Sequence, residues 1–157
     1  TTETYAACTN PSGSDYATVP EGPYHAKVGM HKGAYTALRM EDTDGSGRIE
    51  LGYENPAYTD GRTYAAGINI HKPGENNLTG LTVKKRPISA GCLLIDINSW
   101  NRFIGHFEAE DQKNNTVSVT VSRSLSEPVN VNRLPAFNFI LNGTRESFFS
   151  RIKNRKL

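Results

Sequence analysis

The chain has 157 residues, the usual size of one domain with a single core. Hydrophobic residues make up 36% of it and charged residues 22%, which excludes a disordered or collagen-like chain and favours short strands joined by turns. A net charge of +2 is too small to indicate a nucleic-acid partner. No run of about 18 apolar residues occurs, so we expect no membrane span.

The first 18 residues are small and polar without a regular period, so we predict an arm or linker over residues 1–18. The chain begins at Thr1 without a basic and apolar leader, which we interpret as a processed product or a trimmed chain. Cys8 lies in this arm, far from Cys92. A disulfide between the two is an alternative in an oxidising compartment, and the lack of a CxxC pair excludes a zinc ribbon.

Short strands with turns are predicted from Pro20 to about Ile70. Strands are expected at 24–30 and 35–40, and the Gly-rich run 42–50 (DTDGSGRIE) is typical of a hairpin loop. This run imitates an EF-hand calcium loop, but Tyr53 stands where the bidentate Glu belongs and neither flank has a helical period. We therefore favour a plain turn.

The middle of the chain predicts a strand, a loop and a helix. The segment 67–71 (GINIH) fits a strand that ends at His71, and a loop leads from it to the apolar run 88–95. Four apolar side chains then recur with a helical period, and they are Trp100, Phe103, Ile104 and Phe107. Residues 116–123 (TVSVTVSR) alternate strictly and predict the clearest strand.

The last part of the chain is basic. A strand is expected at 137–141 and a basic amphipathic helix at about 144–154. Five basic residues and one acidic residue follow Asn142. We favour a solvated helix end for this charge, with contact to an anionic surface as the alternative.

The candidate chemistry centres on Cys92. A cysteine becomes a nucleophile when a neighbouring base favours its thiolate and the backbone can stabilise an oxyanion. The Ser89-Ala90-Gly91-Cys92 turn offers such backbone amides, and His71 at a strand end is the candidate base. By spacing alone, an inert cysteine packed as a small apolar residue is the simpler interpretation.

The arrangement of His71, seventeen intervening residues and then Ser-Ala-Gly-Cys-Leu resembles the signature of the L,D-transpeptidase (YkuD-type) catalytic domain. Residues 19–24 (VPEGPY) are similar to the family's Pro-x-Gly-x-aromatic strand entry, and residues 86–89 (RPIS) to its approach to the cysteine turn. Trp100 and Phe103 fall where the family has a helix behind the nucleophile.

The resemblance covers about residues 18–123 and implies a fold. That fold is mainly β with short helices (α+β), an L,D-transpeptidase-like β-sandwich catalytic domain. The domain would span residues 19–123, with residues 124–157 as an extension packed on or flanking it.

The resemblance also implies residue roles. Cys92 would attack the carbonyl of a peptide stem and form a thioester, and His71 would take the thiol proton. The backbone of Ala90, Gly91 and Cys92 would hold the oxyanion, while Ser89 would brace the turn.

The implied substrates are peptidoglycan stem peptides, and the implied nucleophile is acylated by a carbapenem β-lactam. An amine acceptor would give transpeptidation, and water would give L,D-carboxypeptidase or endopeptidase trimming. Tyr64 is a candidate for lining the donor cleft, with a core or rim position as an equal alternative. We expect no metal or cofactor, a monomer, and a periplasmic or secreted location in the cell envelope.

Two positions depart from the family pattern. Ala90 stands where the family usually has His, and Leu94 where Arg or Asn is common. They motivate one alternative, a catalytically weak or inactive cell-wall-binding module of the same fold. The short single-domain layout permits another, a secreted antibacterial effector that attacks a rival's peptidoglycan.

The remaining histidines suggest no metal site, because no HxH or HExxH spacing occurs. We predict surface positions for them, and they are His25, His31 and His106.

Overall fold

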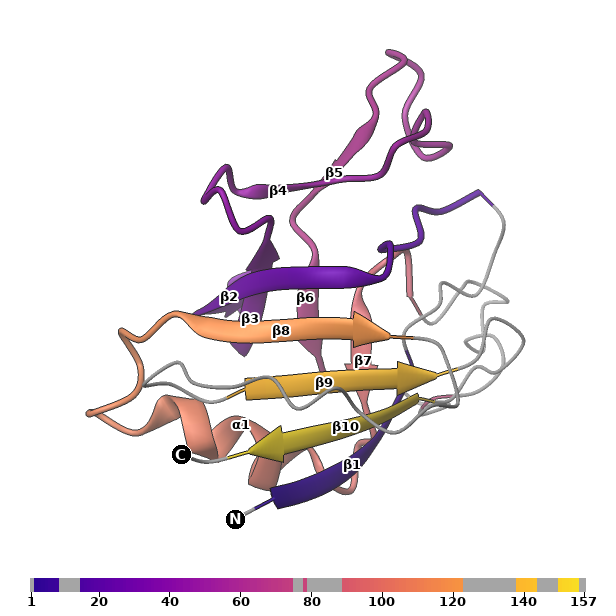
Figure 1. Cartoon of the computed structure of the whole chain (residues 1–157). Helices are drawn as coiled ribbons and strands as arrows, with labels where there is room; N and C mark the ends of the chain where they lie inside the picture. The colour runs from indigo at the N-terminus through magenta and orange to yellow at the C-terminus, as the bar shows by residue number, and fades with distance from the viewer. Residues whose placement is uncertain are drawn as a thin grey trace.

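The chain is mainly β with one short helix over the part that the computed structural model describes (Figure 1). The described residues are 2–8, 15–74, 78, 89–122, 138–143 and 150–155. The strands are β1 (Thr2–Cys8), β2 (Gly22–His31), β3 (Tyr35–Glu41), β4 (Arg48–Glu50), β5 (Tyr64–Ala66), β6 (Asn69–His71), β7 (Leu93–Ile95), β8 (Val117–Ser122), β9 (Asn138–Gly143) and β10 (Ser150–Arg155), and the helix is α1 (Trp100–Glu108). Within these ranges, no helix has the length and hydropathy needed to cross a membrane.

Most strands belong to one curled sheet of mixed direction. Its order is β1-β10-β9-β8-β2-β3-β6-β7, and β7 pairs with β1, so the sheet closes on itself. The pairs β6–β7 and β8–β9 are parallel, and the other pairs in the sheet are antiparallel. Strands β4 and β5 form a separate two-stranded sheet, which lies above β2 and β3 in the view of Figure 1.

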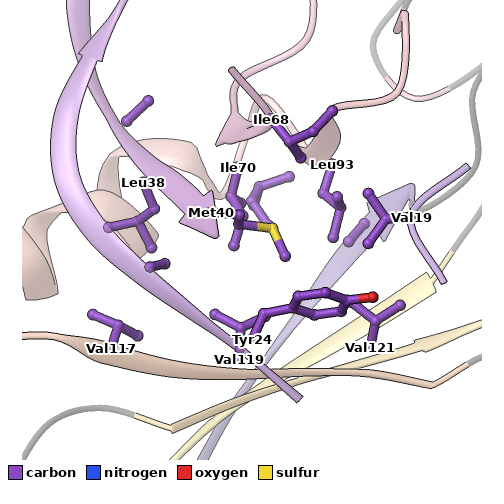
Figure 2. Packing of buried hydrophobic residues seen from close by; sticks show 14 of the residues in the cluster. Val19, Tyr24, Leu38, Met40, Ile68, Ile70, Leu93, Val117, Val119 and Val121 are labelled. Atoms are coloured by element: carbon purple, nitrogen blue, oxygen red, sulfur yellow. The ribbon is translucent and has the colours of Figure 1, made fainter. Parts of the chain in front are cut away.

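Alternating apolar residues fill the inside of the curled sheet. On β8, Val117, Val119 and Val121 are each 1% exposed. They lie beside β2, where Tyr24 is opposite Val119 and Ala26 is opposite Val117. These side chains meet residues of β3, β6 and β7 in one shared interior (Figure 2). The period of two predicted for residues 116–123 thus marks a strand with one buried face.

Helix α1 forms where the apolar side chains recur with a helical period. Its buried residues are Trp100, Phe103, Ile104 and Phe107. The ring of Phe103 meets the ring of Tyr5 edge-on, with 5.5 Å between centroids, and Trp100 meets Tyr35 at 6.1 Å. The helix therefore connects β1 and β3 at one end of the curled sheet.

The two ends of the chain differ from the sequence prediction. Thr2–Cys8, predicted as part of a polar arm, form β1 between β10 and β7. Ser150–Arg155, predicted as part of a helix, form β10 between β1 and β9. The pairing of β1 with β10 joins the two ends of the described chain, so the local pattern carried no sign of it. Residues 9–14 and 144–149 of these two predictions lie outside the described part.

The Gly-rich run after β3 is a turn whose carboxylates bind its own backbone. Asp42 Oδ2 accepts a hydrogen bond from Glu50 N at 2.8 Å, and Asp44 Oδ1 accepts one from Ser46 N at 2.9 Å. The turn links two sheets, however, because β4 pairs with β5 and not with β3.

Candidate functional site

The strands β6 and β7 bring His71 and Cys92 to one face of the sheet. In their parallel register, Ile70 is opposite Leu93 and His71 is opposite Leu94. Ile70 and Leu93 are fully buried inside the curled sheet, so the alternate residues face outward. Cys92 directly precedes β7 and lies diagonally from His71, with about 8 Å between Cα atoms from ordinary sheet spacing.

The thiol of Cys92 is half-buried against the start of β6. Its sulfur accepts a hydrogen bond from Asn69 N at 3.5 Å and donates one to Gly67 O at 3.9 Å. Burial raises the pKa of Cys92, while the Asn69 N–H and the charge of Lys32 act in the opposite direction. The resting form is therefore the thiol, and neither of these hydrogen bonds reaches His71.

The ring of His71 is held by oxygen atoms on its Nδ1 side. Nδ1 lies 2.7 Å from Lys72 O and 3.3 Å from the hydroxyl of Tyr35. Burial lowers the pKa of His71 to about 4, and the charges of His31 and Lys32 add to this. Because a neutral ring donates its Nδ1–H to the Lys72 carbonyl, Nε2 carries the lone pair that can accept a proton.

His31 packs directly against His71, which corrects its predicted surface position. The two rings are stacked with 4.0 Å between centroids and 19° between planes. Asn69 Nδ2 donates a hydrogen bond to His31 Nδ1 at 3.1 Å, and the ring of Tyr35 lies 5.4 Å away. We call these side chains, together with Cys92, the thiol cluster. Sequence reasoning missed His31 because the strand pairing that places it beside His71 is not local.

The turn before Cys92 is braced by Ser89. The Ser89 hydroxyl donates to Cys92 O at 2.5 Å and accepts from Gly91 N at 3.2 Å. Gly91 has a φ of 117°, and a Cβ there would lie 2.8 Å from Ala17 O, so only glycine fits. Since the Gly91 amide already donates to Ser89, the amides of Ala90 and Cys92 remain the candidates for an oxyanion.

Leu94 takes part in a small apolar cluster beside the thiol. It is fully buried and packs with Cys8 and Leu78. Leu94 therefore has a packing role in the structure. No disulfide joins Cys8 and Cys92.

Tyr64 lies on the separate β4–β5 sheet. The guanidinium of Arg48 lies 4.7 Å from the centre of its ring, and that of Arg62 lies 5.4 Å away. Its carbonyl accepts a hydrogen bond from Asn55 at 3.1 Å. Its described contacts are therefore with this small sheet and its loop.

A second polar cluster joins β1 to α1, and it contains His106, which is half-buried and not a plain surface residue. His106 Nε2 lies 2.7 Å from Glu3 Oε2, and Arg102 Nη2 lies 3.0 Å from Glu3 Oε1. The hydroxyl of Tyr5 also donates to Glu3. We call these four residues the β1–α1 cluster.

In the thiol cluster, a protonated thiol and a neutral imidazole whose lone pair is on Nε2 share one face of the sheet. Over the described ranges, no three His, Cys, Asp or Glu side chains are placed to hold a metal ion. Comparisons of the chain with family models, curated proteins and solved structures find no match.

Proposed function

We propose that the protein is a cysteine-dependent acyltransferase that acts on peptidoglycan stem peptides, with Cys92 as nucleophile and His71 as base. The observation that supports this most is the placement of His71 and Cys92 on one outer face of adjacent parallel strands, with His71 neutral. The substrate class and the finer fold, an L,D-transpeptidase-like β-sandwich, rest on the resemblance of the Ser89–Cys92 turn and of the spacing to His71.

The proposed reaction begins with the thiol proton. His71 Nε2 accepts it, and the sulfur of Cys92 attacks the carbonyl carbon of a stem peptide. A C–S bond forms, the C–N bond to the leaving amine breaks, and His71 returns the proton to that amine. An acceptor amine then attacks the thioester and gives a cross-link, or water attacks it and gives a trimmed stem. In both cases the thiol of Cys92 is restored.

The lowered pKa of His71 suits this role, because a base must be unprotonated before it acts. The raised pKa of Cys92 means that sulfur becomes a strong nucleophile only as its proton leaves for His71. The two shifts together support stepwise activation of a neutral pair, in contrast to a resting thiolate–imidazolium pair.

The test is to detect the acyl-enzyme. The full chain is incubated with disaccharide-tetrapeptide muropeptides, and its intact mass and tryptic peptides are measured. We expect the donor acyl mass on Cys92, no adduct in Cys92→Ala, and adduct formation slowed by about 100-fold or more in His71→Ala. Cys8→Ala is the matched control and retains the adduct. Full muropeptide turnover by Cys92→Ala would refute the proposal.

A second candidate is a catalytically inactive wall-binding module of the same fold. The raised pKa of Cys92 and the engagement of the Gly91 amide by Ser89 favour it. The pH dependence of Cys92 alkylation by iodoacetamide separates the two candidates. An enzyme gives a profile that His71→Ala changes, whereas an inert module gives slow alkylation that His71→Ala leaves unchanged, together with co-sedimentation on purified sacculi.

A further inference from the structure

The stacked pair of histidines is tied to Cys92 through one residue. His31 ends β2 and pairs with Tyr35, the first residue of β3. The side chain of Asn69 donates to His31 Nδ1, while its backbone N–H donates to the sulfur of Cys92. Asn69 is only 6% exposed, and both contacts are partly buried. One buried residue thus fixes the place of His31 relative to the thiol.

We propose that His31 is a positioning residue for the His71–Cys92 pair. The ring of His31, held by Asn69, covers one face of His71 and reserves the His71 lone pair for the thiol proton. This inference rests on the proposed function and adds the residue that sets the lowest pH at which His71 can still accept the thiol proton. His31 touches neither the sulfur nor a substrate in this scheme and acts through His71.

The first support is electrostatic. Two imidazolium rings 4.0 Å apart repel each other, so the stack tolerates at most one extra proton. Burial and Lys32 lower the pKa of His31 as well. Both rings are therefore neutral near pH 7, and a proton from solvent on either ring raises the cost of a second.

The second support is the pattern of hydrogen bonds. His31 Nδ1 accepts from Asn69, so its own proton is on Nε2, whereas His71 donates from Nδ1 to the Lys72 carbonyl. Protonation of His31 at Nδ1 would break its bond to Asn69. The Asn69 contact thereby resists the charged form of His31 and preserves the stacked geometry.

The cationic neighbours of His71 disfavour a proton on its ring. Lys32, in the turn after β2, does so through its charge, and His31, at the end of β2, does so once it is itself protonated. On β3, the Tyr35 hydroxyl contacts Nδ1, and burial raises the pKa of Tyr35 and keeps it neutral. Arg39, also on β3, is exposed and lies opposite Asn69 of β6 in the sheet, and Cys92 is present as a thiol.

The experiment compares three variants of the full chain by histidine NMR titration and by the pH profile of Cys92 alkylation. His31→Ala removes the ring that covers His71 and that competes with it for a proton, and we expect the pKa of His71 to rise by at least about one unit, a tenfold change in proton affinity. The acid limb of the alkylation profile moves by the same amount. His31→Phe keeps a flat ring without charge and gives a smaller rise. His25→Phe, on the outer face of β2 farther from the site, is the control and changes neither curve.

The inference is overturned if His31→Ala and His31→Phe both leave the His71 titration and the acid limb at their wild-type positions. This outcome is distinct from failure of the proposed function. A shifted titration without a muropeptide adduct would retain the coupling of the rings and reject the substrate. An adduct with unchanged titration would reject the role of His31 alone.

Discussion

The thiol cluster and the β1–α1 cluster each contain a histidine held between sheet strands and aromatic rings, yet they differ in their partners. His106 faces the carboxylate of Glu3 at 2.7 Å, and Arg102 binds the same carboxylate. His71 faces a second imidazole and a backbone carbonyl. One cluster therefore stabilises charge, and the other excludes it.

This difference shows how the partners of an ionisable side chain determine its charge state. The hydroxyl of Tyr5, followed by His106 and Arg102, lowers the pKa of Glu3 to about 2, so its carboxylate stays ionised. Such a group fastens β1 to α1 through its charge. Burial lowers the pKa of His71 to about 4, and this ring stays neutral and can accept a proton.

The largest effect is expected from Gly91→Ala, which breaks the thiol cluster alone. The new Cβ would lie 2.8 Å from Ala17 O at a φ of 117°, so strain and overlap combine. We expect a loss of roughly 3–4 kcal/mol in the free energy of unfolding, measured by urea denaturation. Gly67→Ala is the matched control, because its φ is 71° with no atom within 4 Å of the new Cβ. It should cost about 1 kcal/mol, and equal losses in the two variants would contradict this prediction.

An intermediate effect is expected when the pH is lowered, because the two clusters lose their stabilising contribution over different pH ranges. Unfolded His71 binds a proton near pH 6.5, but the folded form does so only near pH 4. Between these values the unfolded state binds more protons, so stability is complete above pH 6.5 and falls towards pH 4 by up to about 3 kcal/mol. For Glu3 the corresponding stability is complete above pH 4.5 and is lost as pH falls through about 2.

The variant that checks these two windows is His71→Asn, which can still donate to the Lys72 carbonyl. Urea unfolding is measured from pH 7 to pH 2. The free energy of unfolding should depend less on pH between 6.5 and 4, where His71 titrates, and should keep its wild-type dependence between 4.5 and 2, where Glu3 titrates. If the free energy of unfolding of this variant fell between pH 6.5 and 4 as steeply as that of the wild type, the assignment to His71 would be refuted.

The smallest effect is expected from Glu3→Gln, which weakens the β1–α1 cluster. The amide keeps the shape but loses the ion pair to Arg102 and the carboxylate contact of His106, so we expect a loss of about 1 kcal/mol at pH 7. Cys92 alkylation should not change. Asp60→Asn, in an exposed pair with Arg62, is the control and should have a smaller effect. A loss in Glu3→Gln no greater than in this control would count against a structural role for the cluster.

The sequence predicted the elements whose pattern is local. The strict alternation at 116–123 became β8, and the helical period from Trp100 to Phe107 became α1. The strand ending at His71 is present as β6, although it is short. In each case the burial of one face follows directly from the period of the apolar residues.

What the sequence did not predict depends on contacts between distant segments. β1 and β10 lie at opposite ends of the chain, so neither segment shows its partner in its own pattern. The stack of His31 on His71 requires β3 to separate β2 from β6, and this order follows from the topology of the whole sheet. The brace from Ser89 to Gly91, by contrast, is local, and the role of Ser89 as a brace was an expectation that the family resemblance implied.

The closure of the sheet has a consequence for how the chain folds. β1 pairs with β10 along Thr2 to Ala7 and with β7 at Ala7 and Cys8, so the first strand joins two elements that are synthesised much later. Loop entropy makes such distant pairings slow, and the facing edges of β7 and β10 stay unpaired until they form. The edge of β7 beside the thiol cluster is therefore open until β1 pairs with it, and the other edge of β1 is open until β10 pairs there.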